Sequence, residues 1–339
     1  MKSSILITGV AGFLGSHLAD QFLKLGHRVV GIDNLVGGYY ENVPDSVEFY
    51  KEDLNNFDKI EKYFKDIDIV IHTACTAYEG LSVFSPSFIT KNTSNITVTS
   101  LTASIKHNVK KFVYMSSMAR YGEQDMTPFT EDMIPKPQDP YGISKLYSEE
   151  LVKNLSETHG MKYTILVPHN IIGPRQKYDD PYRNVASIMI NRMLQNKQPI
   201  IYGNGEQVRC FSFIQDVIDP IVKACDLNTA NGMVINIGPD EEFITINELA
   251  KNISNILGFE LSAKYVPGRP KEVFNATCSS DLARKVLGYK TTTTLNEGLE
   301  QLCDWIKVSG TKRFEYHIPI ELITDKTPIT WTKDLFNEN

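Results

Sequence analysis

The segment TGVAGFLGSHL at residues 8–18 restricts the possible folds most, because it sets three glycines between an apolar run and a helical pattern. Gly9, Gly12 and Gly15 are spaced GxxGxxG. One glycine lets the chain turn sharply after a strand, another lets the backbone approach a pyrophosphate, and the third lets helix and strand pack closely. The N-terminus of the helix then faces the phosphates. The segment therefore predicts a dinucleotide site in a parallel α/β sheet.

The first half of the chain repeats this alternation of short apolar runs and longer helical patterns. We predict strands at residues 4–8, 28–33, 47–51, 67–72, 111–116 and 163–168, and helices at 13–26, 56–65, 92–108 and 140–159. Strands joined by helices indicate a mostly parallel, doubly wound sheet with helices on both faces.

The pattern changes after about residue 170, where loop-forming tracts separate shorter elements. We expect a smaller α/β lobe that binds the substrate, and a helix at 216–227 that folds back onto the first domain. The expected division is residues 1–170 with 210–235 for the nucleotide domain, 171–209 with 236–310 for the lobe, and 311–339 for a tail of unassigned role.

An acidic residue ends the second predicted strand. Asp33 lies about twenty residues beyond the glycine turn, where a carboxylate binds the adenosine ribose hydroxyls and repels a 2′-phosphate. This favours NAD over NADP. Asp53 and Leu54, after the third strand, are candidates for contacts with adenine.

Charge and cysteine content exclude several classes of protein. The 339 residues carry a net charge of -6 without a cluster of lysines and arginines, which argues against nucleic acid as a partner. No stretch has the length of a membrane span or the form of a signal peptide, so we expect a cytoplasmic protein without a membrane partner. Five widely spaced cysteines predict neither a disulfide framework nor a metal site.

A serine, a tyrosine and a lysine form the candidate catalytic group. In DPYGISK, Asp139 and Pro140 predict a helix start, which puts Tyr141 and Lys145 on one helical face. An ammonium group and an oxidised nicotinamide both favour the phenolate, so Tyr141 can take a proton from a substrate alcohol. Ser117 follows a predicted parallel strand at the end where ligands bind in such sheets. We expect its neighbour Ser116 to have a packing role.

These motifs, together with VIHTAC, VKKFVYMSS, NIIGPRQ, YGNGEQVRCFSFIQDV and YVPGRPKEV, resemble the extended short-chain dehydrogenase/reductase family. Within it they are similar to the nucleotide-sugar epimerases and dehydratases, and most of all to UDP-glucose 4-epimerase-like enzymes. The resemblance covers nearly the whole chain. It implies a Rossmann-type domain that carries NAD and a C-terminal lobe that holds a nucleoside diphosphate sugar, most of all a UDP-sugar.

The resemblance also implies roles for individual residues. The implied cofactor contacts are Gly9, Gly12, Phe13, Leu14, Gly15, Asp33, Asn34, Asp53, Leu54, Thr73, Ala74, Cys75, Asn92, Tyr141, Lys145 and Pro168. The implied substrate contacts are Ser117, Asn170, Asn184, Tyr202, Arg209 and Arg269. The two arginines are expected on the diphosphate, because a guanidinium fork suits phosphate oxygens.

The residues after Ser117 narrow the reaction. In the dehydratases of this family an Asp-Glu pair follows the equivalent position and eliminates water, a step that needs an acid and a base. Here Met118 and Ala119 stand there, and neither transfers a proton. This favours a 4-epimerase, which inverts C4 through a transient 4-keto sugar. A UDP-uronic acid decarboxylase and a 4-keto sugar reductase stay open, and a non-catalytic NAD or nucleotide-sugar sensor is a less favoured reading.

The sugar-facing segment TAYEGLSVFSP differs from its form in UDP-galactose 4-epimerase, so the sequence leaves the sugar open. The helices at 92–108 and 140–159 carry apolar faces. Relatives pair such helices across a subunit interface, so we expect a homodimer, although packing within one chain gives the same pattern.

Overall fold

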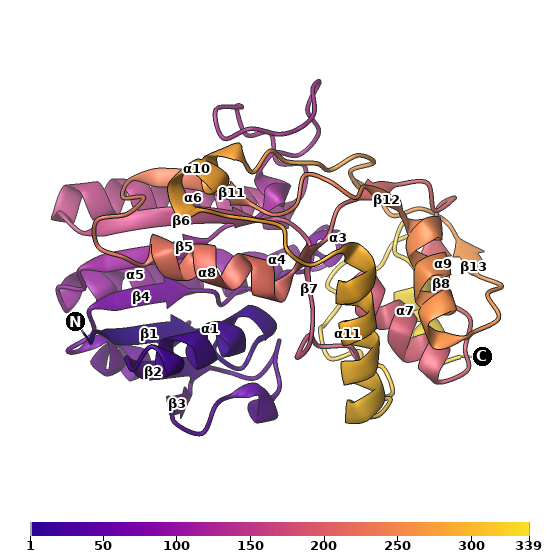
Figure 1. The fold of residues 1–339 in the computed structure, drawn as a ribbon, viewed down its shortest axis with the longest axis horizontal. Coiled ribbons are helices and arrows are strands. Elements are labelled where there is room, and N and C mark those ends of the chain that lie inside the picture. The colour runs from indigo at the N-terminus through magenta and orange to yellow at the C-terminus, as the bar shows by residue number, and fades with distance from the viewer. Residues whose placement is uncertain (1, 339) are drawn as a thin grey trace.

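The computed structural model describes residues 2–338, which form a parallel sheet covered by helices and, beside it, a smaller lobe (Figure 1). The sheet has seven strands in the order β11-β6-β5-β4-β1-β2-β3, and every neighbouring pair is parallel. The order reverses between β1 and β4, and ligands bind beside the carboxyl ends of strands at such a point. The strands are β1 (Ser4–Thr8), β2 (Arg28–Asp33), β3 (Glu48–Lys51), β4 (Ile69–His72), β5 (Lys111–Met115), β6 (Lys162–Pro168) and β11 (Met233–Ile237).

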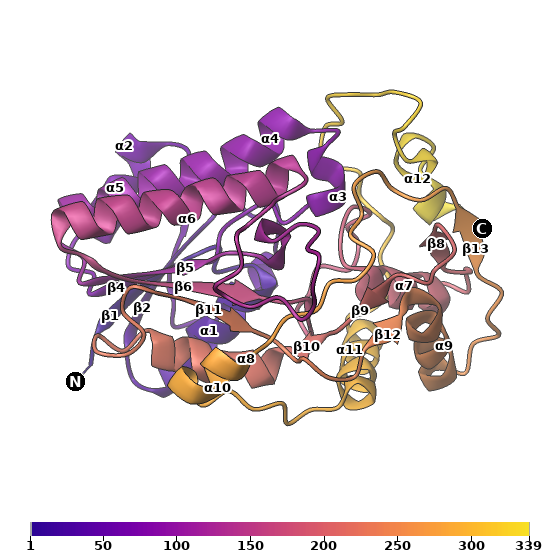
Figure 2. The same cartoon turned by 90° about the horizontal axis from the view of Figure 1, so that it is seen from above.

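Helices cover both faces of the sheet. Figure 2 shows α5 and α6 side by side on one face, and α1, α8 and α10 on the other. Apart from the edge strand β3, the strands between them are mostly apolar and buried, as expected for a sheet covered on both sides. These helices are α1 (Phe13–Lys24), α5 (Ile96–Lys106), α6 (Pro140–His159), α8 (Ile214–Ala224) and α10 (Asp281–Leu287).

The predicted strands and the doubly wound fold are confirmed, with boundaries that differ by at most two residues. Two helix predictions need correction. The predicted helix 56–65 is a short α2 (Phe57–Ile60) followed by a 3-10 turn, and the predicted helix 92–108 begins with a π-helical turn at Lys91–Asn95 that continues α4 (Pro86–Thr90). Strand β11, the edge strand that completes the sheet beside β6, was not predicted.

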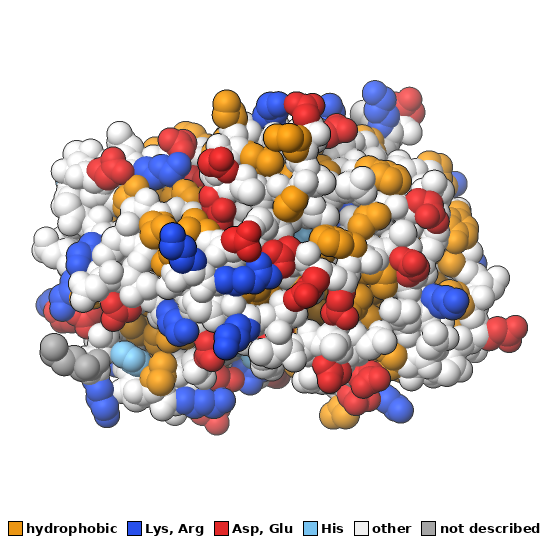
Figure 3. Space-filling view, turned by 45° about the horizontal axis from the view of Figure 1, so that its top comes forward, with side chains coloured by type: hydrophobic (Ala, Val, Ile, Leu, Met, Phe, Trp, Pro, Cys, Tyr) orange, Lys and Arg blue, Asp and Glu red, His pale blue; other side chains and the backbone are white. Residues whose placement is uncertain are grey.

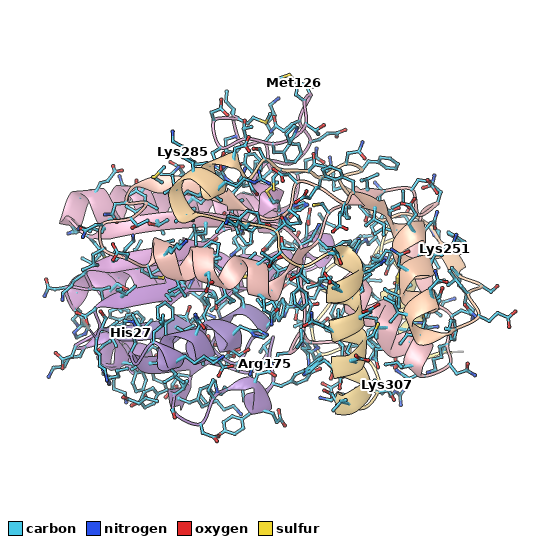
Figure 4. All side chains as sticks on the ribbon, viewed as in Figure 1. His27, Met126, Arg175, Lys251, Lys285 and Lys307 are labelled. Atoms are coloured by element: carbon cyan, nitrogen blue, oxygen red, sulfur yellow. The ribbon has the colours of Figure 1, made fainter. Side chains whose placement is uncertain are left out.

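The smaller lobe is built from three helices and short strand pairs. Its helices are α7 (Val185–Leu194), α9 (Ile246–Leu257) and α11 (Leu295–Ser309), and its strands are β7 (Ile171–Ile172), β8 (Ile200–Tyr202), β9 (Val208–Arg209), β10 (Ser212–Phe213), β12 (Ile244–Thr245) and β13 (Lys264–Val266). Arg175, labelled in Figure 4 at the junction with the sheet domain, pairs with Asp20 of α1 at 2.7 Å. Helix α8 packs against α1, as expected, while the domain boundaries stay a prediction.

The tail folds back over its own chain. The tail, yellow in Figure 2, includes α12 (Ile329–Thr332) and lies near α3 (Glu79–Ser82) and α4, which are purple there. Glu321 accepts the N–H groups of Ser87 and Phe88 at the start of α4, both at 2.8 Å. The buried guanidinium of Arg192 in α7 donates to main-chain oxygens of Leu335, Phe336 and Glu338.

The surface in Figure 3 mixes acidic and basic side chains without a large patch of one sign on that face. Within residues 2–338, no helix combines the length and the apolar character that a membrane crossing requires.

Candidate active site

A cavity of about 720 Å³ opens between the carboxyl ends of the strands and the smaller lobe. Its size suits a small-molecule site. All the residues predicted to bind the cofactor line this cavity, and so do Asn170, Asn184, Tyr202, Arg209 and Arg269 of the predicted substrate set. Ser117 is the exception, and it reaches the cavity through Tyr141.

The glycine turn between β1 and α1 leaves no room for side chains. Gly9 has φ +73°, a left-handed conformation that favours glycine. A Cβ on Gly15 would lie 2.2 Å from the carbonyl oxygen of Gly9, so a larger residue would push helix and turn apart. Helix α1 begins at Phe13, and its free N–H groups face the cavity side of the turn. The predicted roles of the glycines match this geometry.

Asp33 fixes the turn and also lines the cavity. Its carboxylate accepts the N–H of Ala11 at 3.0 Å and the N–H of Leu35 at 2.7 Å. Burial raises the pKa of Asp33, and these amide donors act in the opposite direction. A carboxylate has about four acceptor positions. The Asp33 carboxylate therefore has acceptor positions that these two hydrogen bonds do not use, and ribose hydroxyls can bind there.

The segment after β4 is tied to the first strand. Thr73 Oγ1 donates to the main-chain oxygen of Thr8 at 2.6 Å, so Thr73, Ala74 and Cys75 pass directly over the glycine turn. Asn92 lies in the π-helical turn, and its side chain accepts a hydrogen bond from Asn55 at 2.9 Å. Asn92, rather than Asn95, lines the cavity, which supports the predicted register.

Tyr141 and Lys145 project from the first two turns of α6, whose start is fixed by Asp139. The Asp139 carboxylate accepts the N–H of Gly142 at 2.9 Å, and Pro140 occupies the first turn. Lys145 Nζ donates to the main-chain oxygen of Met115 at 2.7 Å and lies 5.8 Å from the centre of the Tyr141 ring. The predicted pairing of tyrosine and lysine on one helical face is therefore confirmed.

The charge state of the pair follows from burial and neighbours. Burial raises the pKa of Tyr141, and Cys75 acts in the same direction, whereas Lys145 and a hydrogen bond with Ser117 lower it. Burial alone would lower the pKa of Lys145, but Cys75, Tyr114 and Tyr141 raise it above its ordinary value. Lys145 is thus an ammonium and Tyr141 a neutral phenol before any ligand binds.

The residues around Ser117 provide no second acid or base. Met118 and Ala119 are 8% exposed and pack into the core. Ser117 Oγ accepts the N–H of Ala119 at 3.2 Å. Ser116 donates to the buried carboxylate of Glu149, which agrees with the packing role expected for it.

The two predicted phosphate arginines lie together at the lobe side of the cavity. Arg269 Nη2 is 2.8 Å and Arg209 Nη2 3.5 Å from Glu272 Oε1. The guanidinium of Arg269 lies 4.8 Å from the centre of the Tyr202 ring. The Tyr202 hydroxyl forms a hydrogen bond of 2.5 Å with Oγ1 of Thr330 in the tail. The geometry thus links the tail to an arginine of the cavity.

Several charged residues that line this cavity were not predicted, and Glu79, Arg183 and Glu272 are among them. Arg183 donates to the main-chain oxygen of Gly37 at 3.0 Å and lies 5.0 Å from the centre of the Tyr78 ring. Glu272 lies in the motif YVPGRPKEV, three residues after Arg269, but no role was predicted for it. Glu79 lies within the sugar-facing segment whose sequence differs from its relatives, and this was the only signal.

A family model for the NAD dependent epimerase/dehydratase family matches residues 5–238. The chain belongs to the NAD dependent epimerase/dehydratase family. The match spans the sheet through β11, the glycine turn, Tyr141 and Lys145, so the resemblance read from these motifs is confirmed.

Proteins similar to the chain are named for different UDP-sugars. A Methanocaldococcus jannaschii protein provisionally named UDP-glucose 4-epimerase is 36% identical over 89% of this chain and 98% of its own. A UDP-N-acetyl-alpha-D-glucosaminuronate decarboxylase of Bacillus cytotoxicus is 29% identical over 91% and 98%. The structure of UDP-glucuronic acid 4-epimerase from Bacillus cereus with UDP-glucuronic acid and NAD has a TM-score of 0.84, with 31% identity over 91% of this chain and 100% of the other.

NAD is the cofactor of this family member, and the cavity fits it. The glycine turn excludes side chains where a pyrophosphate needs close approach, and the Asp33 carboxylate stands at the end of β2 where a 2′-phosphate would be repelled. When bound, NAD supplies a hydride acceptor and donor.

Proposed function

We propose that the chain is a nucleotide-sugar 4-epimerase that inverts C4 of a UDP-hexose through a transient 4-keto sugar. One observation carries the proposal. Tyr141 faces the cavity with Lys145 and Ser117 beside it, while Met118 and Ala119 are buried and offer no acid or base for a second reaction.

In this proposal Tyr141 takes the proton of the C4 hydroxyl and later returns it. The Lys145 ammonium stabilises the phenolate, and Ser117 shares its hydrogen bond. Arg209 and Arg269 bind the diphosphate as guanidinium forks. Asn170, Asn184 and Tyr202 hold the rest of the nucleotide sugar, and the 4-keto sugar presents its other face before it is reduced.

The main alternative is a UDP-uronic acid decarboxylase, because it shares the oxidation at C4 and a relative with that name is similar over most of the chain. A 4-keto sugar reductase shares the same three side chains but consumes a reduced cofactor. A sensor without turnover is disfavoured, since the proposed catalytic side chains Ser117, Tyr141 and Lys145 are all present.

The test is incubation of the purified protein with UDP-glucose, UDP-N-acetylglucosamine and UDP-glucuronate in separate reactions, with catalytic NAD, followed by NMR of the products. We expect the C4 epimer of one or more sugars without net change of the cofactor. Release of carbon dioxide with a pentose product favours the decarboxylase, and absence of C4 inversion on all three sugars rejects the proposal.

We also propose a homodimer. Ile143 and Tyr147 lie four residues apart on α6 and are 53% and 52% exposed, so they form an apolar stripe available to α5 and α6 of a second copy. Sedimentation velocity tests this, and a monomer at micromolar concentration contradicts it.

A further inference from the structure

Glu79 is a carboxylate of the cavity, near Asp139 and the predicted phosphate arginines, to which no role has been assigned. It is the first residue of α3 and lines the cavity, so its side chain is accessible from the cavity interior. Within residues 2–338 its carboxylate has no hydrogen bond or ion pair. Two other carboxylates there are committed: Asp139 caps α6, and Glu272 pairs with Arg269.

Contacts on either side of Glu79 place it between the two ends of the proposed site. Ser82 Oγ donates to the main-chain oxygen of Glu79 at 2.7 Å and to Asp139 Oδ1 at 3.1 Å, two residues before Tyr141. On the other side, a Cβ built on Gly80 would lie 3.2 Å from Arg269 Nη1. Glu79 therefore lies between the proton-transfer residue and the diphosphate arginines.

The sugar ring has to span this interval, because its C4 hydroxyl goes to Tyr141 and its C1 carries the diphosphate. This step rests on the proposed function. A second negative charge on the ring would meet Glu79. The cations nearest to it, Arg209 and Arg269, are shared with Glu272 and with the diphosphate.

We infer that Glu79 is a specificity-determining residue that selects UDP-sugars with an uncharged ring and disfavours UDP-uronic acids. Its carboxylate accepts a hydrogen bond from a ring hydroxyl or N-acetyl N–H, and it repels a carboxylate at C6. Discrimination of this kind uses a repulsive group against the wrong ligand as well as an attractive one for the right ligand.

The discrimination depends on pH. Burial, then the nearby Asp139, raise the pKa of Glu79 to about 7, whereas Arg209 and Arg269 lower it and Glu272 raises it. Glu79 is therefore mostly protonated below that pH and mostly ionised above it. A uronate is ionised throughout, so repulsion grows as the pH rises.

Calorimetric titration tests the inference through binding, independently of turnover. The NAD-loaded wild type and Glu79→Gln are titrated with UDP-glucose, UDP-glucuronate and UDP at about pH 6 and pH 8. At pH 8 we expect the wild type to bind UDP-glucose about tenfold more tightly than UDP-glucuronate, with a smaller ratio at pH 6. In Glu79→Gln we expect a ratio near one at both values, with the affinity for UDP unchanged.

Glu41→Gln is the matched control, because Glu41 is exposed and outside the cavity, and it should keep the wild-type ratio. Equal ratios in the wild type and Glu79→Gln overturn the inference, and so does tighter binding of UDP-glucuronate by the wild type. NMR turnover assays with the same variants test the epimerase proposal separately. Loss of all turnover in Glu79→Gln with unchanged binding ratios assigns Glu79 to proton transfer instead and also overturns the inference.

Discussion

At the scale of single residues, the proposed reaction requires the buried phenol of Tyr141 to lose its proton. Burial and Cys75 raise the pKa of Tyr141, and Lys145 and Ser117 oppose them. Lys145 keeps its positive charge, because the groups around it raise its pKa. We therefore expect Tyr141 to lose its proton when a positive charge or the substrate binds beside it.

Replacing Tyr141 by Phe removes the hydroxyl proposed to transfer the proton and keeps the ring. We expect kcat to fall roughly 10²- to 10⁴-fold with little change in KM, since proton transfer is lost and binding is not. Product formation by NMR measures this. Tyr40→Phe, at an exposed site outside the cavity, is the control and should keep wild-type rates.

Replacing Lys145 by Met removes the ammonium that lowers the pKa of Tyr141. We expect the acid limb of the kcat/KM profile to move to higher pH, because less phenolate forms at each pH. Rates between about pH 6 and pH 10 with saturating NAD measure the shift. Lys153→Met, on the outer part of the same helix, should leave the profile in place. Superimposable profiles for Lys145→Met and the wild type would contradict the assignment.

The sequence predicted those residues whose chemistry is tied to local spacing. Gly9, Asp33, Tyr141 and Lys145 each stand at a strand end or helix start that the pattern itself indicates. Glu79, Arg183 and Glu272 reach the cavity only because separate loops converge in three dimensions, and no local period records that convergence.

At the scale of elements, the start of α6 is the most consequential feature. Asp139 accepts the N–H of Gly142 and the hydroxyl of Ser82, so it joins α6 to α3. A Cβ on Gly142 would lie 2.5 Å from the main-chain oxygen of Ala119, so the helix start fits tightly against the segment after β5. The cap thereby sets the position of Tyr141.

Replacing Asp139 by Ala removes this cap. We expect a loss of about 1 kcal/mol in the free energy of unfolding, measured by urea denaturation, together with a lower kcat. Thr294→Ala removes the capping box of α11, away from the cavity, and should cost similar stability at unchanged kcat. If Asp139→Ala kept the wild-type kcat, as Thr294→Ala should, the cap of α6 would contribute to stability alone.

Elements with a strong local signal were predicted well, and those decided by packing were not. Helix α6 was predicted with its exact bounds, because Asp139 and Pro140 mark its start and Gly160 ends it in a left-handed conformation. Strand β11 was missed, since its five residues follow a loop tract and gain their place only by pairing with β6. The π-helical turn at Lys91–Asn95 has no sequence signal of this kind.

At the scale of the whole molecule, the tail joins parts that the sequence keeps far apart. Its side chains pack with α3, α4 and the lobe, where Trp331 donates to the main-chain oxygen of Pro181 at 3.2 Å. Phe336 lines the cavity. No role was predicted for the tail, because the contacts that attach it to α4 and to the lobe are distant in the sequence and its pattern is neither a strand nor a long helix.

Replacing Thr330 by Val removes the hydroxyl that holds Tyr202, whose ring lies beside Arg269. We expect the affinity for the nucleotide sugar to fall about fivefold, with NAD affinity unchanged, because one hydrogen bond is worth about 1 kcal/mol. Calorimetry of the two ligands measures both. Thr332→Val, exposed on the same short helix, is the control. If Thr330→Val bound the nucleotide sugar as tightly as the wild type, the tail would have no role in that binding.

The hydrogen bonds from Arg192 to the tail affect how readily the tail detaches from the rest of the molecule. Its contacts join residues that lie 143, 144 and 146 positions apart along the chain. Closing so long a loop costs chain entropy, and few strand hydrogen bonds secure the tail in return. We expect amide hydrogens of the tail to exchange with deuterium long before those of β1 and β4. The wall of the cavity would then open and reseal many times in the life of one folded sheet.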